Sequence, residues 1–341
     1  MTLRRLLLLP GLLFLVAARL AAQGETNVEL LATLLAAEDA RRFEEPTLRV
    51  ALNHPDSTVR AAAAMSAGRL RDPRGVPLLV PHLRDPDSLM QATTAFALGI
   101  LGDTAALTPL LERARDPMRL GNPAALELIT AVARLGGDRA AGFLRDVMQG
   151  ALWSSRDDLP YLAQRAALEA WRLGRKAPVD ALLGMVNDTR EYTRFAAIYS
   201  LGRVRARAAA PRFIDALGDR TSPDVRAAAA RALTKAMADS AGLNPESVVD
   251  VLQRALSDQD PTVRVQGLRS LATFHSARVV PKVLPLLEDP NNNVQVQAAD
   301  ALGEMPGSAA VAELTRVATA TRGSFARRRS ALLAQIGRAH V

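Results

Sequence analysis

Apolar and polar positions along this chain follow a helical period that is itself repeated. Between Val59 and Leu70, apolar or small residues recur three or four positions apart without a proline, which predicts a helix with one buried face. A turn-rich segment, RDPRG, follows, and a second helical pattern covers residues 76–83. An Asp-Pro pair ends this second pattern, and we expect its aspartate to cap the next helix. Residues 54–85 therefore predict one helical hairpin.

The same hairpin recurs almost to the C-terminus, with units 28 to 38 residues apart. A period of this length is typical of a solenoid, and segments that alternate apolar and polar residues as strands do are nearly absent. We therefore predict an all-α fold, an α-solenoid of about nine helical hairpins. The aligned positions are Arg60, Gln91, Leu128, Ala166, Arg194, Arg226, Arg264, Gln295 and Ala326.

The first residues follow a different pattern. Arg4 and Arg5 precede an apolar run over residues 6–16 and then a small-residue segment, which favours a secretory signal peptide over residues 1–23. The apolar run is shorter than the about 20 residues of a membrane-spanning helix. The chain has no cysteine to accept a lipid or form a disulfide. We expect a periplasmic or secreted protein with a solenoid over residues 24–335, which meets the membrane only through its export signal.

The net charge of +8 does not indicate a nucleic-acid partner. Three of these positive charges belong to the predicted leader, and the remaining arginines alternate with acidic residues and form no basic stripe. An arginine-rich solvated surface accounts for the excess. We expect a monomer that binds a protein or peptide and no nucleic acid.

Two segments, DQDPTVRVQGLRSLA at 258–272 and DPNNNVQVQAADALG at 289–303, resemble HEAT repeats of the bacterial, phycobilin-lyase-like kind. The resemblance extends over residues 45–335. It implies that the arginine after the valine ties neighbouring units through an aspartate, a stacking role that falls to Arg60, Arg194, Arg226 and Arg264.

Positions that depart from this motif are expected to stack less regularly. Gln91 and Gln295 can keep a hydrogen bond but cannot form an ion pair, whereas Leu128 and Ala166 can do neither.

Candidate catalytic chemistry is sparse. The four histidines lie in different units or in the tail, and the chain lacks the His-Glu dipeptides that serve as iron ligands in HEAT-fold hydroxylases. We therefore predict no metal, no cofactor and no catalytic residue. A weaker hypothesis assigns a ligand-modifying activity to Asp157 and Asp158 beside Trp153, which a raised carboxylate pKa would support.

Two long links between units are candidate binding loops, at residues 116–123 and 150–161. The second link carries Trp153 and Tyr161 in a chain with few aromatic residues. We predict that these aromatic side chains contact a partner; the alternative is that Trp153 covers a packing defect.

The second helices are expected to line the concave surface of the solenoid and to bind an acidic partner there. The alternative is a mixed solvated face, because acidic residues share this row. The candidate cations of the second helices are Arg113, Arg145, Arg212, Arg254 and Lys282.

The last residues suggest that the gene continues. Residues 327–329 and 331–336 have the pattern of a first helix, and no second helix follows it. IGRAHV with a stop codon is the translation of a common sequencing adapter. Our hypothesis is that residues 336–341 are not native.

The order of leader and repeats resembles the N-terminal half of exported proteins in which a cyclophilin-type peptidyl-prolyl isomerase domain follows HEAT repeats. Two functions therefore remain: a non-catalytic scaffold that binds a partner on its concave face and loop edge, or the recruiting arm of a truncated isomerase.

Overall fold

The computed structural model describes residues 27–116, 120–320 and 324–338. Within these ranges the chain forms α-helices and short 3-10 helices and no strand, which confirms the predicted all-α solenoid. No helix there is long and apolar enough to span a membrane. The predicted signal peptide lies outside the described residues. The chain divides into two compact units, unit 1 over residues 1–166 and unit 2 over residues 167–341.

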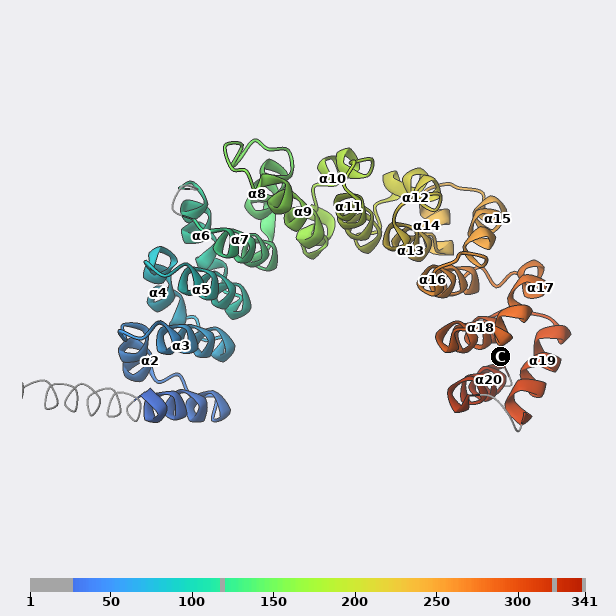
Figure 1. Ribbon diagram of the computed structural model, residues 1–341, viewed down its shortest axis with the longest axis horizontal. Helices are drawn as coiled ribbons and strands as arrows, with labels where there is room; N and C mark the ends of the chain where they lie inside the picture. The colour runs from blue at the N-terminus through green and yellow to red at the C-terminus, as the bar shows by residue number, and fades with distance from the viewer. Residues whose placement is uncertain (1–26, 117–119, 321–323, 339–341) are drawn as a thin grey trace, which may run out of the picture. The chain divides into compact units, whose positions relative to one another are not determined.

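Unit 1 is built from consecutive helical pairs (Figure 1). A helix over residues 27–39 pairs with α2 (Glu45–Leu52). The following pairs are α3 (Ser57–Leu70) with α4 (Gly75–Leu79) and η1 (Val80–Arg84), α5 (Ser88–Leu101) with η2 (Thr104–Ala106) and α6 (Leu107–Ala114), and α7 (Asn122–Leu135) with α8 (Gly137–Met148). Helix α9 (Leu159–Glu169) crosses the boundary between the units.

Unit 2 continues the same order and ends on a single helix. The elements of unit 2 are η4 (Ala170–Lys176) and α10 (Val179–Met185), α11 (Glu191–Arg203) with η5 (Arg207–Ala209) and α12 (Ala210–Ala216), α13 (Pro223–Ala232) with α14 (Lys235–Ser240) and α15 (Pro245–Ala255), α16 (Pro261–Ala272) with η6 (Ala277–Val279), α17 (Val280–Val283) and η7 (Leu284–Glu288), α18 (Asn292–Glu304) with α19 (Ser308–Thr319), and α20 (Phe325–Arg338). Together with unit 1, this gives nine helical pairs in the described residues, in agreement with the number predicted from the sequence.

The Asp-Pro-Asp segments begin the first helices, but the capping residue is the second aspartate. Asp87 accepts a hydrogen bond from the backbone N–H of Leu89 at 2.8 Å and caps α5. Asp85, which the sequence assigned to this role, instead accepts from the backbone N–H of Asp87 at 2.9 Å. The prediction that Asp85 caps α5 is therefore wrong. The carboxylate of Asp85 also accepts hydrogen bonds from the side chain of Arg60.

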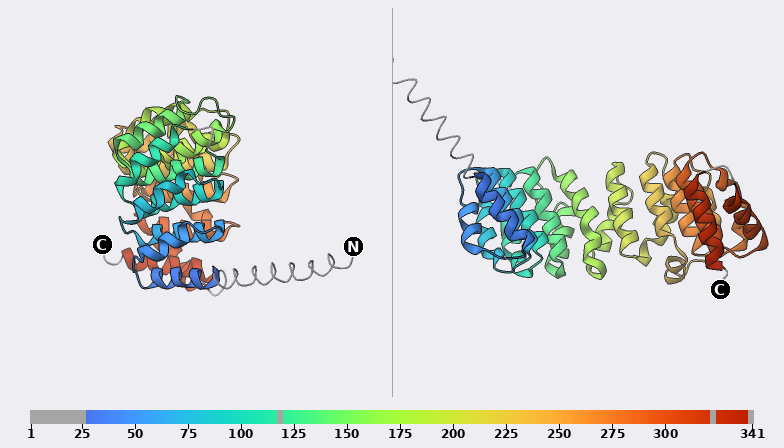
Figure 2. Two further views of the ribbon diagram at one scale, coloured as in Figure 1. Left: turned by 90° about the vertical axis from the view of Figure 1, so that its left-hand side faces the viewer. Right: turned by 90° about the horizontal axis from the view of Figure 1, so that it is seen from below.

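First helices approach one another closely because glycine and alanine meet between them. A Cβ atom on Gly68 would lie 2.8 Å from the carbonyl oxygen of Ala97, and one on Gly303 would lie 2.7 Å from the Cβ atom of Ala334. Figure 2 shows the first helices of each unit lying side by side. Within each unit the stack bends toward this closely packed layer (Figure 1). The first helices therefore line the inner side of each unit, and the prediction that the second helices do so is wrong.

Candidate functional site

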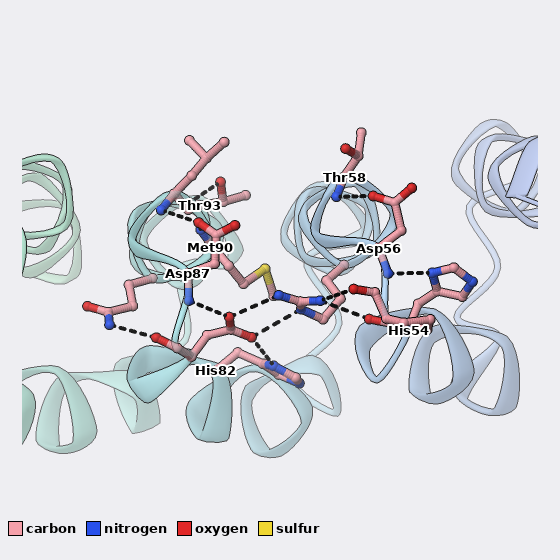
Figure 3. Close-up of polar contacts among 12 residues, drawn as sticks. His54, Asp56, Thr58, His82, Asp87, Met90 and Thr93 are labelled. Carbon is pink, nitrogen blue, oxygen red and sulfur yellow. Dashed lines mark hydrogen bonds and ion pairs between the residues drawn. The ribbon is translucent and has the colours of Figure 1, made fainter. Parts of the chain in front are cut away.

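An arginine links the two loops that flank each regular helical pair. Nε and Nη2 of Arg60 both donate to the carboxylate of Asp85 at 3.1 Å, after the second helix of the pair. Nη1 of the same guanidinium donates to the carbonyl oxygens of His54 and Pro55, before the first helix, at 2.9 and 3.0 Å. Figure 3 shows these contacts, with His54 on one side and His82 and Asp87 on the other. One side chain thus fixes the spacing of consecutive helical pairs.

The same contact recurs three times in unit 2. In each case the arginine lies in a first helix and the aspartate follows the second helix of the same helical pair. All the other arginines predicted to stack make this contact. The pairs are Arg194 with Asp219 at 2.7 Å, Arg226 with Asp258 at 2.7 Å and Arg264 with Asp289 at 2.8 Å.

Asp219 and Asp258 are held in the charged form. Partial burial by itself would raise the pKa of Asp219, but hydrogen bonds from Arg194 and from Ser222 and Thr221 lower this pKa from 3.8 to about 2. Burial alone would raise the pKa of Asp258, but hydrogen bonds from Arg226 and from the backbone N–H of Asp260, with the positive charges of Arg226 and Arg264, together lower it. A carboxylate that stays ionised at neutral pH cannot act as a general acid. The pairs are therefore suited to stacking.

Where glutamine replaces the arginine in unit 1, a second side chain supplies the charge. Nε2 of Gln91 donates to the carbonyl oxygen of Asp85 at 2.7 Å, which is the hydrogen bond that the sequence predicted. Arg113 on α6 donates to Gln91 Oε1 at 3.3 Å and to the carbonyl oxygens of Leu83 and Asp116 at 2.9 and 2.8 Å. Arg113 is 2% exposed. The prediction that Arg113 binds a partner is therefore wrong, because its guanidinium satisfies interior carbonyl groups.

Unit 2 contains a parallel arrangement. Gln295 donates to the carbonyl oxygen of Asp289 at 2.7 Å, while Arg327 of α20 donates to the carbonyl oxygen of Leu287 and to Glu288, both at 2.8 Å. A sequence signal for this similarity exists, since residues 76–91 and 280–295 share the pattern P-x3-P-x3-D-P-x4-Q.

The long link after α8 folds back against unit 1. Trp153 is 4% exposed, and its Nε1 atom donates to the carbonyl oxygen of Ala114 at 2.8 Å. Its ring meets Phe143 edge-on, with centroids 5.7 Å apart. Arg156 donates to the carbonyl oxygen of Leu120 at 2.7 Å. Trp153 is therefore part of the interior of unit 1, and the prediction that its side chain contacts a partner is wrong.

The carboxylates of this link do not form a catalytic pair. Arg156 binds Asp158 through two hydrogen bonds of 2.7 and 2.6 Å, and this contact lowers the pKa of Asp158. Asp157 is exposed. The raised pKa that a ligand-modifying site requires is therefore missing at Asp158. In the described ranges, no group of three or more His, Asp or Glu side chains is placed to hold a metal ion.

The other predicted contact residues lie on the surface. Tyr161 is 67% exposed, and Arg254 and Lys282 are also exposed. Arg145 and Arg212 are exposed too, but each pairs with an aspartate of its own helix at 3.4 and 3.6 Å. These last two cations therefore belong to a mixed charged face, which leaves less positive charge for an acidic partner than the sequence suggested.

An apolar groove on the first helices of unit 1 was not predicted. It has a volume of about 820 Å³, and Leu89 at its edge is 64% exposed. Glu127, the one charged residue that lines it, pairs with Arg165 at 3.5 Å. The sequence signal is a set of apolar residues on one face of the first helices. These residues are Ala61, Ala62 and Met65 of α3, Leu89, Ala92 and Phe96 of α5, and Pro123 and Leu126 of α7.

The helical pairs, their stacking arginines and their close glycine contacts define an α-solenoid. A family model of HEAT repeats matches residues 45–127, 150–234 and 242–334, which is more than half of the chain. The chain therefore belongs to the HEAT-repeat family. No curated protein matches it in sequence.

Solved structures share the fold at low sequence identity. Importin beta is 15% identical with a TM-score of 0.60, over 85% of this chain and 45% of its own. A homology model of the full-length AP-3 complex is 11% identical with a TM-score of 0.59, over 86% and 57%. Kap121p bound to Nup53p is 16% identical with a TM-score of 0.53, over 85% and 37%. At these identities the similarity shows the fold alone.

Proposed function

We propose that this chain is a non-catalytic HEAT-repeat scaffold and that the groove of unit 1 binds an amphipathic helix of a partner protein. The observation that carries the proposal is the apolar groove of about 820 Å³ across α3, α5 and α7. A concave surface lined mainly by apolar side chains favours binding of a partner or ligand. HEAT-repeat proteins serve as binding scaffolds, and the similarly folded Kap121p was solved with Nup53p bound.

The shape of the groove favours a helix over an extended peptide. Its lining includes Ala61, Ala62 and Ala92, whose small side chains let another backbone approach closely. The longer side chains of the lining, among them Leu89 and Phe96, can pack against apolar residues spaced three and four apart on a bound helix. An extended strand would instead need unpaired backbone groups at an edge, which a helical surface does not offer.

Site-specific cross-linking tests this assignment. A photoreactive benzophenone side chain at Leu89 should capture a partner in cells, whereas the same group at Val50 should not. Both positions are exposed, at 64% and 63%, but Val50 lies on α2 away from the groove. Ala62→Glu should abolish the cross-link by placing a charge in the groove, and Ala36→Glu, at an exposed position of the same unit, should leave it unchanged. Equal capture from Leu89 and Val50 would contradict the proposal.

Export of the scaffold is a second part of the proposal. The basic start, apolar run and small residues within residues 1–23 support a cleaved signal peptide. Edman sequencing of the protein recovered from the periplasm or medium should give a mature N-terminus between residues 21 and 24. Recovery of the unprocessed chain from the cytoplasm would contradict export. Light scattering of the mature protein tests the proposed monomer.

The recruiting-arm alternative places the same groove in a longer protein. Sequencing the genomic copy of the gene at codons 335–341 tests this alternative. If these codons came from an adapter, the genome should contain further coding sequence in their place. A native stop codon after residue 341 would exclude the truncated isomerase.

A further inference from the structure

A pocket in unit 2 is lined by three arginines and no acidic residue. It lies among α11, α13 and α14 and has a volume of about 570 Å³, within the range of small-molecule sites. Glycine, alanine and methionine residues form the rest of its lining. The polar residues that line it are Tyr199, Arg203, Arg205, Arg231, Thr234 and Ser240.

This pocket forms where the repeat is interrupted. Thr234 occupies the position that holds a glycine in several other helical pairs, and α13 ends two residues earlier, at Ala232. Leu233 has a non-helical ψ of 67°, and Thr234 Oγ1 accepts a hydrogen bond from the backbone N–H of Met237 at 3.3 Å and so caps α14. The chain thus starts a new short helix where other first helices continue, and the pocket lies beside this break.

The three guanidinium groups have no acidic partner within the described residues. Arg203 instead lies over the ring of Trp171, with its Cζ atom 4.2 Å from the ring centroid, which holds the guanidinium in place. Arg231 lies in the last turn of α13, and Arg205 follows α11 with a left-handed φ of 55°. Cations near helix C-termini are favourable by themselves, so the test must separate this role from ligand binding.

The chemistry of the lining selects the ligand. Three guanidiniums carry three positive charges, and an organic phosphate offers a charge of about −1.5 to −2 with three acceptor oxygens, whereas a carboxylate offers one charge and two oxygens. The planar fork of arginine matches phosphate oxygens in pairs. The half-buried ring of Tyr199 provides apolar surface for the organic part. We propose that this pocket binds the phosphate group of a small organic phosphate, a function separate from the groove of unit 1.

Isothermal titration calorimetry on the full chain tests this proposal with phenyl phosphate, benzoate and inorganic phosphate as probes. Arg205→Gly removes one guanidinium and relieves a left-handed residue, so the fold should be retained. Arg71→Gly is the matched control, because Arg71 also has a left-handed φ, 54°, and lies outside this pocket. We expect phenyl phosphate to bind the wild type and Arg71→Gly equally, and Arg205→Gly at least about tenfold more weakly. Arg231→Gln should weaken binding to a similar extent.

Each probe has an outcome that overturns part of this assignment. Absence of phenyl phosphate binding, or equal binding by wild type and the double variant Arg205→Gly, Arg231→Gln, would show that the arginines serve only the helix ends. Benzoate that binds as tightly as phenyl phosphate would overturn the phosphate preference. Inorganic phosphate that binds as tightly would overturn the role of the apolar surface. None of these results bears on cross-linking from Leu89, so the two proposals fail independently.

Discussion

Asp219→Asn tests whether the arginine–aspartate pairs stabilise the stack. Asp219 accepts hydrogen bonds from Arg194 at 2.7 and 3.3 Å, and the two side chains are 11% and 14% exposed. The fall of its pKa from 3.8 to about 2 corresponds to about 2 kcal/mol of unfolding free energy at pH 7. Because the folded pKa lies below the unfolded value, this contribution is complete above about pH 5 and is lost as the pH falls from 4 to 2. About 1 kcal/mol should remain at pH 3.

Native-state hydrogen exchange is the appropriate assay, because repeat arrays need not unfold in a single step. In Asp219→Asn, the opening free energy of the α11 and α13 amides should fall by about 2 kcal/mol at pH 7 and by about 1 kcal/mol at pH 3. Asp215→Asn is the control, since Asp215 is 68% exposed and forms a surface pair with Arg212. Its effect should stay below about 0.5 kcal/mol. Equal effects of the two substitutions, or a loss in Asp219→Asn that does not depend on pH, would refute the reasoning.

Three further predictions concern packing and are tested by denaturation. Gly99→Ala should lower the unfolding free energy by about 2 kcal/mol, because a Cβ atom there would lie 2.8 Å from the neighbouring backbone. The control Gly184→Ala, with open space around it, should raise the unfolding free energy by about 0.5 kcal/mol, and changes of the same sign in both variants would contradict this prediction. Trp153→Phe should lower the unfolding free energy by about 1 kcal/mol, because the hydrogen bond to Ala114 is lost. An effect on partner capture without this loss of stability would show that Trp153 contacts the partner. Gln91→Arg should destabilise by placing a cation beside Arg113, and adding Arg113→Gln should recover most of the loss; additive effects in this cycle would exclude the exchange.

Local sequence information was sufficient for the helical pairs. The first helix predicted over residues 59–70 is α3, Ser57–Leu70. The second, predicted over residues 76–83, is α4, which continues to Arg84 as the 3-10 helix η1. Each unit of a solenoid packs mainly on its neighbours, so the period, the turn residues and the recurring Val-Arg motif contain most of the information that the fold requires.

Side-chain direction was not available from the same pattern. Arg113 and Arg145 both lie near the ends of second helices, yet one is buried and the other is 53% exposed. The difference depends on Gln91, which lies 22 residues before Arg113 and leaves interior carbonyl groups that need a donor. The burial of Trp153 also depends on a contact distant in sequence, because its indole N–H donates to the carbonyl oxygen of Ala114, 39 residues earlier.

Departures from the repeat thus fall into two kinds that the sequence alone does not separate. A lost stacking arginine leaves buried carbonyl groups, and the cost of leaving them unpaired favours a replacement donor from elsewhere in the chain, as Arg113 and Arg327 show. A lost glycine has a different result at Thr234, since the helix breaks and the arginines that line the resulting pocket gain no carboxylate. A departure of this second kind leaves polar groups available to a ligand. The Arg205→Gly titration therefore tests the distinction itself, because an arginine that repairs the stack would affect stability and one that serves a ligand would affect binding.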